Sequence, residues 1–370
     1  MKILFILGTR PEAIKLAPLI RVFRERKSFT TKVCVTGQHR QMLDQVLDFF
    51  CIASDFDLNM MKQNQTLFDI SSDGLKLLEP VLTNFAPDLI FVQGDTTTAF
   101  IGALAGYYKK IKVAHVEAGL RSGNLLSPFP EEGNRKLISQ ISNYHFAPTT
   151  AASDHLKAEG ITENVHVVGN TVIDALLWGL EIIKSKGDIV FKEAFKNIDF
   201  SKKIILVTGH RRESFGDPFL NICKAIKEIA TKFKDKVEIV YPVHFNPNVQ
   251  KPVHEVLKNL LNVHLIEPLS YPYLIWLLNK SYLVLTDSGG IQEEAPSLGK
   301  PVLVMREVTE RMEGIIAGTA KLVGSNRAQI VNEVTDLIEN PLQYEKMAKA
   351  VNPYGDGKTC ERILNLLKSE

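Results

Sequence analysis

The strongest constraint on the fold is a pattern that occurs twice along the chain. Six short apolar runs in the first half are mostly separated by stretches with helical patterning, and six more follow in the second half. The runs are residues 3–7, 32–36, 89–93, 113–117, 144–147, 165–168, 203–208, 237–241, 263–266, 282–286, 302–305 and 321–323. Continuous apolar strands that alternate with helices are typical of parallel sheets covered on both faces. The pattern therefore predicts an α/β protein with two Rossmann-like domains.

The length of 370 residues suits two domains. We place the first domain at residues 1–170 and the second at 171–354, with a helical stretch at 172–184 and a polar connection to about residue 202. A loop rich in turn formers then precedes a last helix at about 360–368, and we expect residues 355–370 to pack back on the first domain. Ligands of doubly wound sheets bind beyond the carboxyl ends of the strands, so we expect the two domains to face a cleft.

Charge and composition limit the kind of partner. The formal net charge is only +2 and no Lys/Arg block resembles a nucleic-acid footprint, so we expect a small anionic partner and no nucleic acid. No apolar stretch is long enough to span a membrane, and the short opening Met1–Leu7 predicts a buried strand rather than a signal peptide. The four cysteines lack the spacing of a zinc site or a redox dithiol, which predicts reduced thiols in a cytoplasmic protein.

One segment of the second half suits phosphate binding. The apolar run Ser281–Thr286 stops at Asp287-Ser288-Gly289-Gly290 and leads into Ile291–Ala295, which predicts a strand, a tight Gly turn and a helix start. Glycines let the backbone approach a ligand, and the first-turn N–H groups can bind a phosphate or pyrophosphate. Glu293 and Glu294 would repel a bare phosphate. At least one should therefore have another task, such as accepting hydrogen bonds from ribose hydroxyls, unless both only complement the helix dipole.

Reactive side chains also follow the predicted strands of the first half. Arg10 is left at the carboxyl edge of the first strand, with Lys15 about one turn into the next helix. Asp95 follows residues 89–93 and either belongs to a site or caps a helix that begins in the threonines. Glu117 ends an otherwise apolar strand, where a buried carboxylate without a role or partner would be costly. These positions favour a site at this edge of the sheet.

Two helix starts carry further ionisable residues. Pro130–Arg135 opens a helix in which Glu131 and Arg135 are one turn apart and able to pair, although such a pair can also merely brace the helix. The first strand-to-helix turn of the second half supplies His210, which is either a site residue or an ordinary loop histidine. A cleft rich in carboxylates and cations, without obvious redox or metal parts, indicates acid–base chemistry on a phosphorylated substrate.

Common cofactor motifs are missing from the sequence. No Gly-x-Gly-x-x-Gly follows a predicted strand, which argues against a tightly held NAD. Gly357-Lys358-Thr359 is similar to the end of a P-loop, but Asn352 stands where the leading glycine should be and no strand precedes it. His254 lacks a second histidine at zincin spacing, and the histidines form no convincing metal set. We therefore expect no cofactor and no metal.

Together these motifs resemble one family, the bacterial non-hydrolysing UDP-N-acetylglucosamine 2-epimerases, which are built on the glycosyltransferase-B fold. The resemblance covers essentially the whole chain. The matching motifs are residues 8–12, 37–40, 92–96, 116–121, 130–135, 210–213, 286–294 and 352–357. So many spaced motifs in one order are far more specific than any one of them.

The resemblance implies reversible conversion of UDP-N-acetylglucosamine into UDP-N-acetylmannosamine. The family eliminates UDP in the anti sense across carbons 1 and 2, which gives 2-acetamidoglucal, and adds UDP back with the proton delivered to the opposite face. Carbon 2 has no adjacent carbonyl to acidify its proton, so direct removal and return is a poor route. The elimination needs carboxylates near carbon 2 and cations that hold the departing diphosphate. Family members are typically homodimers, which we expect here too.

By the same resemblance, roles pass to individual residues of this chain. The catalytic candidates are the carboxylates Asp95, Glu117 and Glu131, with Arg135 and His210 in the same cluster. The substrate-binding candidates are Arg10 and Lys15 in the first domain and Ser288, Gly289, Gly290, Glu294 and Arg311 in the second. Of these, Ser288, Gly289 and Gly290 should bind the diphosphate and Glu294 the ribose hydroxyls. The resemblance does not assign the carboxylate that removes the proton.

The chain departs from the family pattern at two places. Met312 stands where the family commonly has proline, so the loop around Arg311 should be looser. Some bacterial members bind a second UDP-N-acetylglucosamine as an activator, and the residues concerned are matched here by Gln38, Gln41, Glu131, Arg212 and His244. Asn64 stands where those members have arginine, which weakens the case for activation.

The sequence leaves other functions open. The same chemistry could act on a related UDP-sugar, such as a diacetamido uronic acid or an N-acetylated 6-deoxy sugar. A retaining glycosyltransferase of the same fold would need an acceptor groove. A UDP-sugar-binding module without catalysis is the alternative from another class, and the presence of all three carboxylates disfavours it.

Overall fold

The computed structural model describes residues 1–37, 40–62 and 64–368. Contacts divide the chain into two compact units, and each is described by itself. Unit 1 combines Met1–Trp178 with Tyr354–Glu370, and unit 2 is Gly179–Pro353. In the part of the chain that is described, no helix is long and apolar enough to cross a membrane.

Unit 1 is built on a parallel sheet of seven strands in the order β3-β2-β1-β4-β5-β6-β7. The strands are β1 (Lys2–Leu7), β2 (Thr30–Val35), β3 (Phe56–Asp57), β4 (Leu89–Gln93), β5 (Lys112–Val116), β6 (Tyr144–Ala147) and β7 (Val165–Val167). The helices are α1 (Arg10–Arg24), α2 (Arg40–Phe49), α3 (Leu67–Phe85), α4 (Thr97–Tyr108), α5 (Glu131–Ile141), α6 (Thr150–Ala158), the first part of α7 (Thr171–Lys186) and α16 (Thr359–Lys368).

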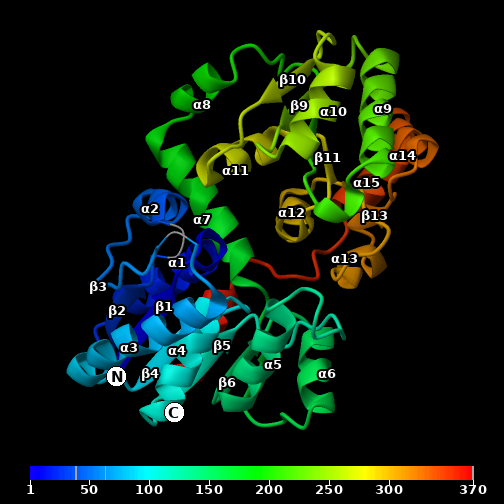
Figure 1. The fold of residues 1–370 in the computed structure, drawn as a ribbon. Coiled ribbons are helices and arrows are strands. Elements are labelled where there is room, and N and C mark those ends of the chain that lie inside the picture. The colour runs from blue at the N-terminus through cyan, green and yellow to red at the C-terminus, as the bar shows by residue number, and fades with distance from the viewer. Residues whose placement is uncertain (38–39, 63, 369–370) are drawn as a thin grey trace. The chain divides into compact units, whose positions relative to one another are not determined.

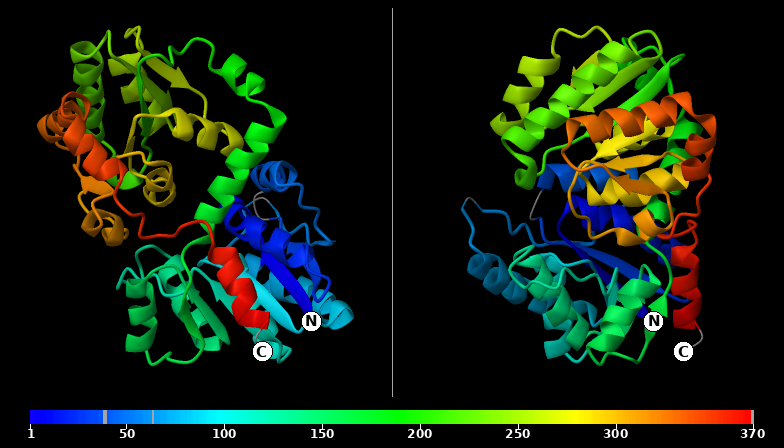
Figure 2. Two further views of the ribbon diagram at one scale, coloured as in Figure 1. Left: turned by 180° about the vertical axis from the view of Figure 1, so that it is seen from behind. Right: turned by 90° about the vertical axis from the view of Figure 1, so that its right-hand side faces the viewer.

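Helices cover both faces of the unit 1 sheet. Helix α4 contacts α3 and α5 on one face, and α1 contacts α2 and α16 on the other (Figure 2). The strands between them are apolar on both faces, and Ile3–Leu7 is wholly buried. Gly8 follows β1 at a point where a side chain has no room, since an added Cβ would lie 2.1 Å from Thr36 Oγ1. The chain can therefore turn tightly from the sheet into α1.

Unit 2 is built on a parallel sheet of six strands in the order β10-β9-β8-β11-β12-β13. Figure 1 labels β9, β10, β11 and β13 of this sheet. The strands are β8 (Lys203–Thr208), β9 (Val237–Pro242), β10 (Val263–Ile266), β11 (Leu283–Thr286), β12 (Val302–Val304) and β13 (Ala320–Leu322). The helices are the rest of α7, α8 (Ile189–Ala194), α9 (Asp217–Lys232), α10 (Pro247–Leu257), α11 (Tyr271–Lys280), α12 (Gly289–Glu294), α13 (Met312–Ile316), α14 (Arg327–Glu339) and α15 (Pro341–Ala348), with 3₁₀ turns η1 (Arg212–Ser214) and η2 (Ala295–Leu298).

Each unit has its own apolar core. In unit 2, α9 packs between α10 and α14, and the buried residues of α9, α10 and α14 form one cluster with the sheet. In unit 1, a cluster centred on α3 and α4 packs against β1, β4 and β5. Parallel sheets with helices on both faces, present in both units, confirm the predicted fold class of two Rossmann-like domains.

The segment after Pro353 is bound to unit 1 by backbone contacts and a helix cap. The Asn170 N–H donates to the Tyr354 carbonyl at 2.7 Å. Asp174 of α7 accepts the N–H groups of Thr359 and Cys360 at 3.3 and 2.9 Å, so a neighbouring helix supplies the cap of α16. Helix α16 then packs against α1 and buries its apolar face. The sequence 357–359 thus lies in a turn and the first residue of this helix, without a preceding strand.

Two elements were missed by the sequence pattern. The two-residue strand β3 is too short to give an alternation signal, and it extends the unit 1 sheet beyond β2. Helix α8 lies in the segment expected to be a polar connection, although it has only six residues. Phe191 of α8 and Phe195 just after it stack near Trp276 at centroid distances of 5.9 and 5.4 Å, which accounts for its order.

Candidate active site

The carboxyl ends of β4 and β5 bring candidate residues of unit 1 together. These strands are neighbours in the sheet, with Gln93 paired to Val116, so Asp95 and Glu117 follow adjacent strand ends. Asp95 does not cap α4, because Thr96 is the N-cap residue and accepts the Ala99 N–H at 3.0 Å. The capping alternative for Asp95 is therefore wrong.

Glu117 is held as a buried carboxylate in an uncommon backbone conformation. It lies just beyond β5 with φ of 64°, the left-handed region that side chains other than glycine rarely adopt. Its side chain is 4% exposed and its Oε2 lies 2.5 Å from Lys15 Nζ. Gln93 also donates to Oε2, and Asn170 donates to Oε1 at 3.4 Å. Lys15, expected to contact substrate, is thus already the ion-pair partner of a candidate catalytic acid.

Arg135 joins Asp95 to a buried carboxylate of α5. It contacts Asp95 Oδ2 through both Nε, at 3.1 Å, and Nη2. Its Nη1 donates at 3.0 Å to Glu132, which is fully buried and also accepts backbone N–H groups of Ser122 and Gly123. The pair expected between Arg135 and Glu131 is absent among the described residues, because Arg135 turns to Glu132 one residue further along the helix. Glu131 is the first residue of α5 and is half-buried.

The start of α1 carries Arg10 close to a third buried carboxylate. Arg10 is the first residue of the helix and is half-buried. Glu12, fully buried, accepts the N–H groups of Gly8 and Thr9 at 3.0 and 2.7 Å and the Thr96 hydroxyl at 2.7 Å. Burial raises the pKa of the Glu12 carboxyl, against the lowering effect of these hydrogen bonds. Glu12 therefore ties the turn after β1 to the turn that carries Asp95.

In unit 2, Asp287 organises the turn that carries His210. Strands β8 and β11 are neighbours, and Asp287 Oδ2 accepts the backbone N–H groups of His210 and Arg211 at 2.6 and 2.7 Å. The Asp287 Oδ1 atom lies 3.8 Å from His210 Nδ1. The His210 ring is 48% exposed and stacks on the His244 ring with centroids 5.1 Å apart. The turn thus presents one imidazole to solvent at the carboxyl edge of the sheet.

The expected phosphate turn is already helical. Ser288 is the N-cap residue of α12, and Gly289 and Gly290 form its first turn, so the prediction of a separate Gly turn is wrong. An added Cβ on Gly289 would lie 3.0 Å from Arg311 Cζ, so a side chain there would require the Arg311 guanidinium to shift. The backbone N–H groups of this first turn remain suited to an anion.

The two acids that follow these glycines have different partners. Glu293 is 2% exposed and lies 3.0 Å from Arg311 Nε. Glu294 is buried and accepts the Tyr271 hydroxyl at 3.0 Å. Burial, followed by the nearby Glu294 charge, raises the pKa of Tyr271 well above its ordinary value. Glu293 therefore fixes Arg311, whereas Glu294 is oriented by a neutral phenol.

A buried arginine connects the segments that carry His210 and Arg311. Arg306 follows β12 and is 4% exposed. Its Nε donates to Glu213 at 2.6 Å, and its Nη1 and Nη2 donate to Glu310 at 2.9 and 3.2 Å. Burial alone would raise the pKa of Glu310, but Arg306 lowers it to about 2. The loop with Met312 in place of proline is also held where Thr309 donates to Gln292 at 2.8 Å.

The residues that match an activator site are only partly described. Gln38 and the side chain of Gln41 lie outside the described residues. Arg212, in η1, and His244 are exposed in unit 2. Asn64, the departure from the family pattern, is exposed in unit 1 and has a left-handed φ of 57°. The match to an activator site therefore stays a prediction.

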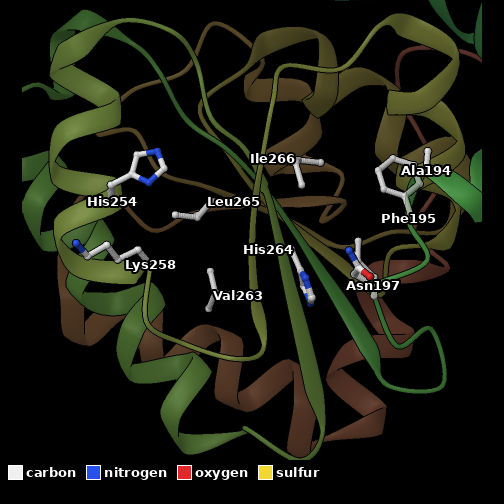
Figure 3. A pocket seen from close by; sticks show the side chains of 10 residues that line it. Ala194, Phe195, Asn197, His254, Lys258, Val263, His264, Leu265 and Ile266 are labelled. Atoms are coloured by element: carbon white, nitrogen blue, oxygen red, sulfur yellow. The ribbon is translucent and has the colours of Figure 1, made fainter.

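A pocket of about 420 Å³ lies elsewhere in unit 2, along the edge strand β10 (Figure 3). Its lining is Ala194, Phe195, Asn197, Ile198, His254, Lys258, Val263, His264, Leu265 and Ile266. None of the predicted site residues lines it. His264 is held by Glu238 at 2.6 Å, which also pairs with Lys202. The described residues contain no group of histidine, cysteine, aspartate or glutamate side chains that could hold a metal ion.

Within each unit, sequence reasoning missed the residues that hold the candidate side chains and their loops in position. They are Glu12, Gln93, Glu132, Asn170, Tyr271, Asp287 and Arg306. A signal existed for some, because Glu12, Glu132 and Asp287 belong to the motifs that suggested the site. Their burial was the missing information, since a buried carboxylate needs donors around it.

Comparison with known proteins places this chain in a family. Residues 21–368 match the family described as UDP-N-acetylglucosamine 2-epimerase. The UDP-N-acetylglucosamine 2-epimerase of Campylobacter jejuni is 54% identical over 99% of this chain and 97% of its own length. That of Escherichia coli K12 is 52% identical over 100% of this chain and 99% of its own.

A solved structure agrees over the full length. The UDP-GlcNAc 2-epimerase from Neisseria meningitidis, solved bound to UDP-GlcNAc, superposes with a TM-score of 0.92 at 50% identity and covers 100% of both chains. The fold and these relatives define the class, a sugar-nucleotide epimerase with two Rossmann-like domains. The chain belongs to the UDP-N-acetylglucosamine 2-epimerase family.

Proposed function

We propose that this chain interconverts UDP-N-acetylglucosamine and UDP-N-acetylmannosamine at carbon 2 of the sugar. The proposal rests on its family and, above all, on one observation in unit 1. Asp95 and Glu117 follow adjacent strand ends and each is paired with its own cation, Arg135 or Lys15. Acid–base chemistry at a carbon needs carboxylates held in fixed positions, and these ion pairs provide them.

The proposed reaction is an anti elimination followed by re-addition. A carboxylate removes the proton on carbon 2 while the bond from carbon 1 to the UDP oxygen breaks, which gives 2-acetamidoglucal and UDP. The UDP oxygen then bonds to carbon 1 again, and a second group delivers a proton to the opposite face of carbon 2. Asp95, Glu117 and Glu131 of unit 1 are the acid–base candidates. Arg135 of unit 1 and His210 of unit 2 are the other catalytic candidates.

The departing UDP needs a place that binds a diphosphate and a ribose. We propose that Ser288, Gly289 and Gly290 supply backbone N–H groups to the diphosphate, with Arg311 adding charge. Glu294 is supported as the ribose acceptor because Tyr271 orients its carboxylate at 3.0 Å. Glu293 is less suited to accept hydrogen bonds from the ribose, since its carboxylate pairs with Arg311 at 3.0 Å. Arg10 and Lys15 complete the proposed substrate contacts in unit 1.

Product analysis in deuterated water tests both the function and the route. Pure protein incubated with UDP-N-acetylglucosamine as sole substrate should give UDP-N-acetylmannosamine, with deuterium at carbon 2 seen by NMR. Epimerisation without the label would contradict the proton transfer. Turnover only after addition of an acceptor would indicate a glycosyltransferase instead, and stronger turnover of another UDP-N-acetyl sugar would change the substrate.

Scrambling of an oxygen isotope tests the elimination step. If the bond from carbon 1 to oxygen breaks, ¹⁸O placed in that bridging position should exchange into the non-bridging positions of the β-phosphate. Asp95→Asn should suppress label exchange at carbon 2. Asp154→Asn is a suitable control because Asp154 is 62% exposed and, among the described residues, forms its one ion pair with Lys157 on the same helix. Full turnover by the Asp95 variant would remove that residue from the mechanism.

A further inference from the structure

His115 is a buried histidine that touches the turn before Asp95. It lies on β5, two residues before Glu117, and is fully buried. Its Nε2 lies 2.7 Å from the carbonyl oxygen of Gly94, which is the residue next to Asp95. A carbonyl can only accept, so the ring must carry its hydrogen on Nε2 and donate it to Gly94.

The contact fixes the peptide that leads into Asp95. Gly94 has a left-handed φ of 69°, and its N–H donates to the Val116 carbonyl at 3.0 Å. The N–H and the C=O of Gly94 are thus both bound to β5, the strand that leads to Glu117. On the other side, Asn134 donates to the Asp95 carbonyl at 2.9 Å. The position of Asp95 relative to Glu117 therefore depends on the contacts of Gly94 with β5 and on Asn134.

The ring is suited to this task because it stays neutral. Burial lowers the pKa of His115 to about 3, and the Gly94 contact only partly opposes this. Its Nδ1 is buried without a hydrogen-bond partner among the described residues. A neutral imidazole with hydrogen on Nε2 leaves Nδ1 as an unprotonated acceptor, which costs less to bury than an unpaired N–H donor or a charge.

We propose that His115 is a positioning residue, which fixes the Gly94 carbonyl and thereby the distance between the candidate acid–base groups Asp95 and Glu117. The inference rests on the proposed epimerase function, because it assigns those two carboxylates to one reaction. Small displacements of a reacting group lower the rate of chemistry more than the affinity for substrate. Loss of the contact should therefore lower kcat and leave KM nearly unchanged.

Two amide substitutions of His115, to glutamine and to asparagine, differ only in how far the amide nitrogen extends towards Gly94. The Nε2 of His115→Gln is as many bonds from Cβ as the histidine Nε2, so it can still donate to Gly94. The amide of His115→Asn is one methylene shorter and falls short. We expect His115→Gln to keep kcat within about threefold of the native enzyme, and His115→Asn to lose roughly 10- to 100-fold in kcat with KM within about twofold. Equal activity of the two variants would overturn the inference.

His145 is the matched control. It pairs with His115 across β5 and β6, is 3% exposed, and has its pKa lowered to about 4, mainly by burial. The backbone of Ser142, and not the Asp95 turn, partly opposes this lowering of the pKa. His145→Asn and His145→Gln should lose similar stability to their His115 counterparts but keep kcat within about threefold. A comparable fall in kcat for His145→Asn would indicate a general effect of disturbing the sheet.

A measurement on the native protein does not depend on how any variant folds. Long-range ¹H–¹⁵N correlation spectra should show His115 as the neutral tautomer with hydrogen on Nε2 and unchanged from pH 5 to 8. A ring that titrates in this range, or carries hydrogen on Nδ1, would overturn the inference. Native turnover of UDP-N-acetylglucosamine is measured first, and its absence would refute the proposed function, while the spectra still decide whether His115 makes the contact.

Discussion

The ion pair between Lys15 and Glu117 allows its structural and catalytic roles to be separated. The two side chains are 13% and 4% exposed and their charged atoms are 2.5 Å apart. Removing one partner leaves the other charge buried, which typically costs about 3–5 kcal/mol. Because Lys15 keeps some contact with solvent, we expect Lys15→Met and Glu117→Gln each to destabilise unit 1 by about 3 kcal/mol, near the low end of that range.

The double variant should be less unstable than the sum of the two changes. It loses the pair only once, so we expect a loss of about 3 rather than about 6 kcal/mol and a coupling free energy of about 3 kcal/mol. Activity should behave differently, since the double variant still lacks the Glu117 carboxylate. The second change should therefore add little instability to either single variant, while turnover stays as low as in Glu117→Gln. If Glu117 were purely structural, turnover would instead follow the loss of stability.

The chain offers a local probe for this experiment. There is one tryptophan in each unit, and Trp178 stacks on Phe50 with centroids 4.7 Å apart, under the Arg21 guanidinium at 4.3 Å. In a Trp276→Phe background, Trp178 fluorescence during urea unfolding reports on unit 1. The exposed pair Lys109–Glu79, at 3.0 Å, is the control and should couple by less than about 1 kcal/mol. Strict additivity of the Lys15 and Glu117 changes would refute the buried-pair argument.

Three further changes test other parts of the structure. Gly289→Ala would place a Cβ 3.0 Å from Arg311 Cζ and push the guanidinium away from Glu293. We therefore expect calorimetry to show UDP binding about tenfold more weakly, a loss of about 1.4 kcal/mol. Unchanged affinity would argue against Arg311 as a ligand contact. Glu310→Gln should lower the urea midpoint at pH 7. The pKa of Glu310 is lowered from 4.5 to about 2 in the folded protein. The native protein should therefore be more stable than Glu310→Gln above about pH 4.5, and this difference in stability should disappear as the pH falls towards 2. A stability difference that does not depend on pH would contradict this. Gly133 lies on α5 with nothing within 4 Å of an added Cβ, so Gly133→Ala should stabilise the protein by about 0.5–1 kcal/mol in urea unfolding. Gly123 is equally open but has a φ of 79°, so Gly123→Ala should destabilise the protein. The same sign for both variants would refute the backbone argument.

The strands were the most predictable part of the fold. Runs such as Leu89–Gln93 and Lys203–Thr208 match β4 and β8 residue for residue, because strands buried on both faces are apolar throughout. Glu117 was expected to end its strand but leaves the ladder with a left-handed φ. Periodicity carries no signal for such a conformation, which is stabilised by partners distant in sequence.

The sequence indicated which residues are candidates for the site, but not which side chains contact one another. Asp95 and Arg135 are separated by 40 positions and meet because β4 and α5 converge in unit 1, which no local spacing predicts. The spacing from Glu131 to Arg135 suggested a pair that the structure replaces with Glu132. Side-chain pairing depends on burial and on competing acceptors, and a helical repeat contains neither.

The return of the chain to unit 1 has a consequence for its synthesis. Asp174 caps α16, whose apolar face packs against α1. In the sequence, however, all of unit 2 lies between α16 and the rest of unit 1. Domains generally fold as units while they emerge from the ribosome. Unit 2 is contiguous, so it has all of its residues once Pro353 has emerged. Unit 1 starts to be synthesised first, but the face of α1 that packs against α16 stays uncovered until this last helix has been synthesised.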